Sequence, residues 1–297
     1  MLIVSQALIP HQDGVTLHPD LFLWDKQLAD RKQSWFHAAD RTPAEWYASL
    51  QGSDVTALLA RQIEVMPAAT SQCWSVTPYH GQLMRDSIRV YPEGLFPWCS
   101  EDAAWLCSTL NPLLAEEGMT LLHSGAALLL SCRDALDAKP LSFAAISGKM
   151  LPNRHHEGAD GGRLNRLMAE IQMMLHQQQP ESRRQRGEVD VSGIWLSNPV
   201  AWPQVIIEKK IAVATRNPHL SAIVDGQNAT VVISEAERLD QLVKGNVELP
   251  KRIVLTGEGY AVLLNRSLLP TFGKPSWSPK RVKSEVELIS KLSGWIA

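Results

Sequence analysis

The stretch Arg163–His176, RLNRLMAEIQMMLH, decides the expected fold of this chain together with the strand-like segment Val191–Leu196 that follows it. Its apolar side chains recur at the three- and four-residue spacing of one helix face. They are Leu164, Leu167, Met168, Ile171, Met174 and Leu175. Methionines on such a stripe usually fill gaps in a core. We therefore expect a helix over 163–179 that packs against a sheet, and not a ligand-binding surface.

Outward from this helix, apolar runs of strand length alternate with helical segments. Leu2–Ile9 predicts a first buried strand, and Thr42-Pro43-Ala44-Glu45 carries the cap, proline and glutamate of a helix start. Strand-like runs continue toward the C-terminus at 211–215, 229–233, 252–256 and 260–265, and a last amphipathic helix is expected at 284–295. Strands that alternate with helices predict an α/β fold with a central sheet.

Between these ends, glycine and proline divide the pattern. Pro78 and Gly81 interrupt 72–90, which we interpret as strand, loop, strand. Ser100 is expected to cap a helix to Glu117 that Pro112 bends or ends early. Gly125 lies between two short apolar runs and predicts a hairpin.

Composition excludes several classes of protein. The net charge of −2 gives no overall attraction to nucleic acid or to a membrane. No apolar run approaches the ~18 residues of a membrane span, and the start lacks a basic segment, so we expect a cytoplasmic protein. The four cysteines form no C-x-x-C pair, which favours buried reduced thiols over zinc.

The middle of the chain resembles a known family. The motifs are Ser147-Gly148-Lys149 with Leu151-Pro152, the helix above, and Ile194-Trp195-Leu196. In this order they resemble the archaeal-type cofactor-independent phosphoglycerate mutases and, more closely, their shorter RpfE-type regulatory relatives. Thr77-Pro78-Tyr79-His80 and Glu116-Glu117-Gly118 also match segments of those relatives. The likeness covers roughly residues 73–198.

The resemblance implies an alkaline-phosphatase-like core sheet flanked by helices, with a helix-rich inserted or cap region. It divides the chain into 1–72, the N-terminal part of the core, 73–198, the mutase-like middle, and 199–297, the C-terminal part of the core. The resembled mutases hold two divalent metals with Asp and His ligands. After Val200 this chain has one histidine, His219, and two aspartates. Because most of these ligands are missing, we expect no metal site and no cofactor, and we favour a protein without catalytic activity over an enzyme.

Two functions follow from this reading. The first is a non-catalytic, phosphoglycerate-mutase-like binding or regulatory protein that acts through a protein partner. The alternative is a phosphoryl-transfer enzyme with a reduced site, for which Mn or Mg would be needed. Its candidate catalytic residues are Asp13, His80 and Arg85, which would have to converge on one point.

A histidine and an arginine between strands could also bind an anion without catalysis. The candidate ligand-binding residues are Thr77, His80, Arg85 and Lys149. A structural turn is the alternative for this segment, and we favour it. His155-His156-Glu157 could bind a metal but is better explained as a solvated loop. The run Arg183, Arg184 and Arg186 could bind nucleic acid, although an exposed helix face is favoured.

Overall fold

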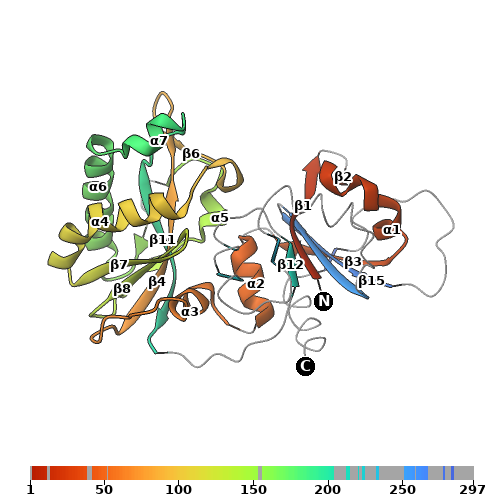
Figure 1. Cartoon of the computed structure of the whole chain (residues 1–297), viewed down its shortest axis with the longest axis horizontal. Helices are drawn as coiled ribbons and strands as arrows, with labels where there is room; N and C mark the ends of the chain where they lie inside the picture. The colour runs from red at the N-terminus through yellow and green to blue at the C-terminus, as the bar shows by residue number, and fades with distance from the viewer. Residues whose placement is uncertain are drawn as a thin grey trace. The chain divides into compact units, whose positions relative to one another are not determined.

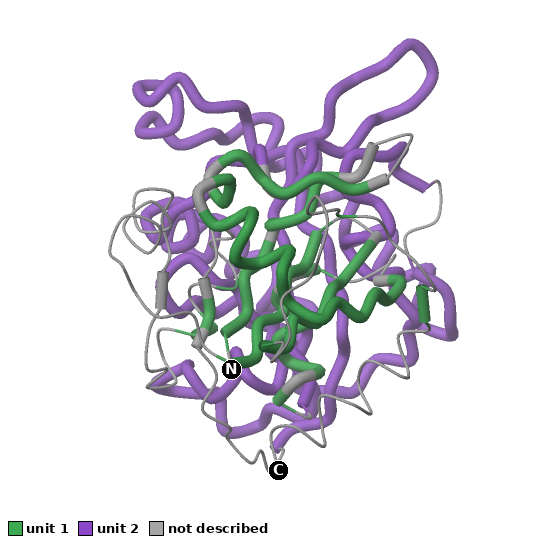
Figure 2. The backbone as a smooth tube through the Cα atoms, turned by 90° about the vertical axis from the view of Figure 1, so that its right-hand side faces the viewer, with its two compact units in different colours: residues 1–52, 207–297 green, residues 53–206 purple. Residues whose placement is uncertain are grey.

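A computed structural model describes residues 2–11, 14–38, 42–51, 53–152, 156–203, 212–214, 220, 223–224, 232–233, 251–257, 259–266, 277 and 282–283. The chain forms two compact units. Unit 1 contains residues 1–52 and 207–297, and unit 2 contains residues 53–206 (Figure 2). Both combine strands and helices, so the predicted α/β class is confirmed.

Unit 1 is built on a mixed sheet of seven described strands in the order β13-β12-β1-β14-β15-β3, with β2 paired to β1 (Figure 1). The strands are β1 Leu2–His11, β2 Gly14–Leu17, β3 Lys32–Ala38, β12 Ala212–Ala214, β13 Val232–Ile233, β14 Arg252–Gly257 and β15 Gly259–Asn265. The helices are η1 Pro19–Trp24, α1 Asp25–Ala29 and α2 Pro43–Gln51. β1 runs parallel to β12 and β14, whereas β14 and β15 form an antiparallel hairpin.

Both faces of β1 are buried, since neighbouring residues that point to opposite sides, Leu2, Ile3 and Val4, are all at most 6% exposed. Such continuous apolar strands are typical of parallel sheets covered on two sides. The predicted strand at the N-terminus and the predicted strands near 252–265 are therefore confirmed. The predicted helix at 284–295 lies outside the described residues.

The predicted helix start in unit 1 is a capping box. The Thr42 N–H donates to the Glu45 carboxylate at 2.7 Å, and the Glu45 N–H donates back to the Thr42 hydroxyl at 3.2 Å. Each bond satisfies a donor that would otherwise lack a partner at the helix end. The sequence motif alone was sufficient to predict where α2 begins.

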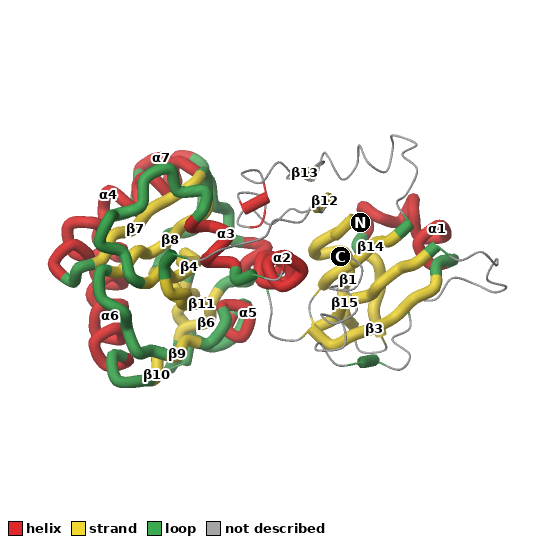
Figure 3. The backbone as a smooth tube through the Cα atoms, turned by 90° about the horizontal axis from the view of Figure 1, so that it is seen from below, coloured by secondary structure: helices red, strands yellow, loops and turns green. Residues whose placement is uncertain are grey.

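Unit 2 contains an antiparallel four-stranded sheet in the order β11-β4-β8-β7 (Figure 3). Its strands are β4 Gln72–Tyr79, β7 Met119–Ser124, β8 Ala127–Cys132 and β11 Gly193–Ala201, with short pairs β5 Gly81–Leu83, β6 Ile88–Val90 and β9 Lys139–Pro140, β10 His156–Glu157. Its helices are α3 Val55–Ala60, η2 Glu93–Leu95, α4 Ser100–Glu116, α5 Phe143–Ile146, α6 Gly161–Gln177 and α7 Glu181–Gln185. The middle region thus has a sheet of its own, and a helix-rich cap is not confirmed. The unit begins earlier and ends later than the predicted region 73–198.

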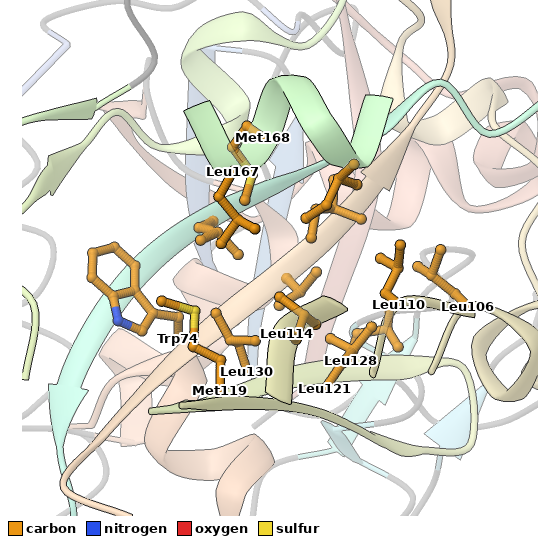
Figure 4. Close-up of a cluster of buried hydrophobic side chains, with 14 of the residues drawn as sticks. Trp74, Leu106, Leu110, Leu114, Met119, Leu121, Leu128, Leu130, Leu167 and Met168 are labelled. Atoms are coloured by element: carbon orange, nitrogen blue, oxygen red, sulfur yellow. The ribbon is translucent and has the colours of Figure 1, made fainter. Parts of the chain in front are cut away.

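The helices α4 and α6 cover one face of this sheet and bury its main core (Figure 4). On α6 the predicted stripe is buried, apart from a half-buried Met174. Leu106, Leu110 and Leu114 of α4 are fully buried beside it. At about 1.5–3 kcal/mol for each large apolar side chain, this burial is the main stabilising contribution in the unit. α3 contacts the other face of the sheet (Figure 3).

Three local predictions in unit 2 were wrong. Pro78 lies inside β4 and does not interrupt it. The residue that caps α4 is Cys99, whose N–H donates to the Asp102 carboxylate at 3.2 Å, and not Ser100. The early end expected at Pro112 was wrong, since α4 continues to Glu116, because one lost backbone bond costs less than the buried leucines of this helix contribute. The predicted hairpin around Gly125 is confirmed, with φ of 55° at the glycine.

Asn111 of α4 closes the outer edge of β7. Its side chain donates to the Leu121 carbonyl at 3.1 Å and accepts from the Leu121 N–H at 2.7 Å. Covering an edge in this way prevents unwanted pairing with another strand. Within the described residues, no helix is long and apolar enough to cross a membrane.

Candidate functional site

His80 follows directly after β4, where the chain leaves the four-stranded sheet. Its Nδ1 lies 2.8 Å from the Asp190 carbonyl and 3.4 Å from the Ser192 hydroxyl. Because a carbonyl can only accept, this contact assigns a proton to Nδ1. The ring meets Tyr91 edge-on at 5.8 Å. His80 is thus oriented by the backbone of a neighbouring segment, as a structural turn requires.

Arg85 lies with Asp86 at the far end of the hairpin formed by β5 and β6, and both are exposed. β5, Gly81–Leu83, lies between His80 at the base of the hairpin and Arg85 at its turn. The structure therefore separates these two candidates.

Lys149 belongs to a segment that adds a third strand to the hairpin. The Val90 N–H donates to the Lys149 carbonyl at 2.8 Å, and the Leu151 N–H donates to the Ile88 carbonyl at 2.7 Å. We call residues 80–91 together with 149–151 the hairpin sheet. Gly148, with φ of 71°, provides the left-handed turn before the added strand. Lys149 and Leu151, which belong to one of the motifs behind the family resemblance, therefore lie on the edge strand of a small sheet.

Thr77 belongs to the four-stranded sheet and not to the hairpin sheet. It is half-buried within β4, directly opposite Trp195 of β11. Two residues on, Tyr79 lies in the cluster that contains Trp195, Phe143 and Ile146. Burial raises the pKa of Tyr79 to about 12, against the opposing effect of the hydrogen bond that Gln172 donates. Of the four predicted ligand-binding residues, three lie on the hairpin sheet, yet they do not meet at one point.

Asp13, the remaining catalytic candidate, lies outside the described residues, as does His155. Thr16 is exposed and donates to the Ile9 carbonyl across the β1–β2 hairpin at 3.4 Å. Among the residues that the structure describes, no three or more histidine, cysteine, aspartate or glutamate side chains gather where they could hold a metal ion.

His156 is buried, although its neighbours in sequence predicted a solvated loop. It is 3% exposed, with its ring stacked on Trp195 at 5.8 Å and edge-on to Trp74 at 6.3 Å. Asn165 of α6 holds the backbone of His156 through two hydrogen bonds. The solvated-loop interpretation was wrong for this residue because two tryptophans from different strands enclose it.

The arginine run is also not an exposed helix face. Arg183 is 1% exposed and pairs with the fully buried Asp102 at 2.8 Å. Its guanidinium also donates to the carbonyls of Pro97 and Val189 and lies 5.1 Å above the Phe96 ring. These contacts hold the guanidinium inside the unit, so Arg183 is not available to bind nucleic acid.

Arg186 completes the same network from the surface. It donates to Asp102 at 2.7 Å and to Glu188 at 3.0 Å, and hydrogen bonds with Glu188 and Asp102 raise the pKa of its guanidinium. Arg184 is exposed and lies 3.8 Å from Glu181. The three arginines thus link α7 to the start of α4 through ion pairs. Acidic side chains balance their positive charges.

The cysteines are free thiols. We refer to Cys73, Cys107 and Cys132 as the three buried cysteines. Burial raises their pKa values, to about 11 for Cys73 and about 12 for Cys107 and Cys132. A neutral thiol is a poor nucleophile and metal ligand. The interpretation of these three as buried reduced thiols agrees with their environment.

No protein-family model and no curated protein matches the chain. Among solved structures, the chain is similar to the cofactor-independent phosphoglycerate mutase from Thermoplasma acidophilum, with 14% identity, 99% of each chain covered and a TM-score of 0.36. It is also similar to the PH0037 protein from Pyrococcus horikoshii, with 11% identity, 99% of this chain and 96% of the other covered, and a TM-score of 0.41. A likeness of this degree assigns neither a family nor an activity.

Proposed function

We propose that the protein is a non-catalytic, phosphoglycerate-mutase-like binding or regulatory protein of the cytoplasm, and that its ligand is another protein. One observation supports the proposal above others. His80, Arg85 and Lys149, the residues expected to bind a ligand, lie on an exposed three-stranded sheet and are spread along it. Phosphoryl transfer needs groups that converge on one reacting atom, whereas a spread of exposed side chains suits a protein surface.

Alternation along the strands strengthens this argument. His80 and Gln82 lie on one face of the hairpin sheet, because side chains two residues apart in an extended chain point to the same side. Lys149 pairs beside Val90 and so belongs to the opposite face. Two anion-binding side chains on opposite faces of one sheet cannot hold the same phosphate. The candidate residues therefore support recognition over a surface and not a phosphosugar cleft.

The sequence contributes the second line of support. The mutases that the middle region resembles need two metals, and this chain has only His219, Asp225 and Asp240 as histidine or aspartate after Val200. These residues lie outside the described part of the chain, so this argument rests on their number alone.

Turnover and melting measurements test the proposal. 3-Phosphoglycerate is incubated with the protein and Mn²⁺ or Mg²⁺, and isomerisation and phosphate release are followed. We expect neither reaction, and no shift of Tm with Mn²⁺ alone or with Mn²⁺ and 3-phosphoglycerate. A ligand of the folded state at a hundredfold excess over its Kd would stabilise by about 2.7 kcal/mol, which a melt detects. Metal-dependent turnover that disappears in Asp13→Asn would establish the enzyme alternative and reject our proposal.

A further inference from the structure

The hairpin sheet carries exposed apolar side chains, and its inner and outer faces differ. Val90 is fully buried and Leu151 is half-buried, because both pack on the cluster of Tyr79, Phe143 and Trp195. The outer face carries Gln82, Arg89 and Met150 side by side across three strands. In Figure 1 the hairpin is the loop that reaches beyond the main sheet near the label β6.

Three apolar side chains near the hairpin turn are left in solvent. Leu83 is 82% exposed, Met150 is 52% exposed and Met84 is 41% exposed. Met84 and Met150 both lie on the outer face near Ser87, whose hydroxyl contacts the Met150 sulfur at 3.4 Å. Leu83 is on the other face, beyond the part that packs on the unit. Exposed apolar groups that gather in one place mark an interaction site more often than scattered ones do.

The charges around these side chains are mostly positive. Arg85, Arg89 and Lys149 are exposed, and Asp86 is the single acid on the hairpin sheet. Arg89 donates through Nε to the Gly148 carbonyl at 3.0 Å, which fixes its position on the outer face. The chain as a whole has a net charge of −2, so this basic surface is a local feature. An acidic partner is the complement of such a surface.

The outer edge of β5 also offers backbone groups. The Met84 N–H donates to the Ser87 carbonyl, and the Tyr91 N–H donates to the His80 carbonyl. The backbone N–H and carbonyl groups of the even-numbered residues in this strand therefore point toward β6. The N–H and carbonyl of Leu83 therefore point away from β6. Within the described part of the chain, nothing covers Leu83 as Asn111 covers Leu121 on β7. An extended segment can pair with such an edge.

We propose that the hairpin sheet binds an extended, acidic segment of a partner protein whose apolar side chains contact Leu83 and Met84. Carboxylates of that segment pair with Arg85 and Arg89, while its backbone bonds to Leu83 on the edge of β5. This inference rests on the proposed binding function and adds the surface and the chemistry of the partner.

A membrane is the other surface that basic and apolar side chains can bind. The turn of the hairpin, residues 84–87, would enter lipid first, and it carries the exposed Asp86 carboxylate. Burying the Asp86 carboxylate among lipid chains or beside anionic headgroups is unfavourable. A protein segment avoids this because it can pass along the hairpin and leave the turn in water.

The test measures binding of a fluorescent peptide of alternating glutamate and leucine to the full chain by anisotropy. The variant Leu83→Ser/Met84→Ser is expected to bind at least about tenfold more weakly, since two apolar contacts are lost. Met173→Ser is the matched control, because Met173 is 60% exposed on α6, away from the hairpin sheet. We expect the control to bind like the wild type, and unchanged Tm values would show that all variants fold.

A charge exchange tests the electrostatic part. Arg85→Glu/Arg89→Glu is expected to lose the glutamate–leucine peptide and to gain a lysine–leucine peptide, and both effects should weaken as salt rises. No binding by the wild type, or equal losses in the hairpin and Met173 variants, would overturn the inference. So would binding of the hairpin to phosphatidylserine vesicles without binding of the peptide.

The outcome for this surface can be told apart from the outcome for the proposed function. Metal-dependent turnover of 3-phosphoglycerate would reject the non-catalytic function and leave a peptide-binding hairpin in place. Absence of peptide binding in a protein without turnover would reject the hairpin inference alone.

Discussion

The buried pair between Asp102 and Arg183 leads to a strong prediction about stability. Asp102 is fully buried, and its carboxylate accepts from Arg183 at 2.8 Å and from Arg186 at 2.7 Å. Asp102→Asn keeps the shape of the side chain but removes the charge that balances Arg183. Removing one partner of a buried pair costs about 3–5 kcal/mol. Glu188, 3.3 Å from Arg183, remains as a partial partner, so we expect about 3 kcal/mol.

Hydrogen exchange measured by mass spectrometry follows this loss, because the chain has two units that need not unfold together. Amides of α4 and α6 should exchange on the order of a hundredfold faster in Asp102→Asn, while peptides from β1 and β14 should not change. Glu101→Gln is the control, since Glu101 is 66% exposed and its pair with Arg186 is worth at most about 1 kcal/mol.

The size of the effect is the decisive result. An Asp102→Asn protein that exchanges like the Glu101→Gln control would refute our account of the pair as an essential part of unit 2. The double variant Asp102→Leu/Arg183→Met adds a second check. Because it leaves no unpaired charge, it should be more stable than Asp102→Asn.

Three further predictions concern thiols, a phenol and a glycine. At pH 8 a thiol reagent such as DTNB should modify only the half-buried Cys99 in the folded protein, and the three buried cysteines should react only on unfolding; rapid labelling of all four would contradict their burial. The pKa of Tyr79 is about 12 in the fold against about 10 in an unfolded chain, so the unfolded state loses its proton first and stability falls between pH 10 and 12. Urea midpoints across that range should fall less steeply in Tyr79→Phe than in the wild type, and equal slopes would argue against a raised pKa. Gly193→Ala should destabilise by about 1–3 kcal/mol because its Cβ would lie 2.7 Å from the Tyr79 oxygen; in the control Gly162→Ala the Cβ has no neighbour within 4 Å, and a similar loss there would exclude this steric explanation.

Several elements could be predicted because short-range chemistry specifies them. The stripe on α6 needs only helical spacing, and the start of α2 needs only Thr42 and Glu45. Pro78 shows the limit of such reasoning, since proline usually interrupts a strand, yet this one pairs within β4 opposite Ile194. β8 pairs with β4 only as far as Val76, so Pro78 lies where β4 pairs with β11 alone, and such a position tolerates a proline.

The candidate site was harder to predict because its residues depend on distant segments. His156 lies in a polar sequence, and nothing near it shows that Trp74 and Trp195 will enclose it. The sequence predicts Arg183 as one of three surface arginines. In the fold it is buried and forms an ion pair with Asp102, which is far away in the chain. For both residues the useful signal was a partner distant in sequence, which one sequence does not reveal.

The sequence by itself determined the α/β class, the apolar stripe of the helix predicted over 163–179, the hairpin at Gly125, the strands at 252–256 and 260–265, and the scarcity of histidine and aspartate after Val200. These follow from periodicity, turn residues and residue counts, which are local properties. Only the tertiary structure decided that Lys149 adds a strand to the hairpin of His80 and Arg85, and that these side chains lie apart. Burial and pairing between remote strands set those positions, and their energy arises only when the chain is folded.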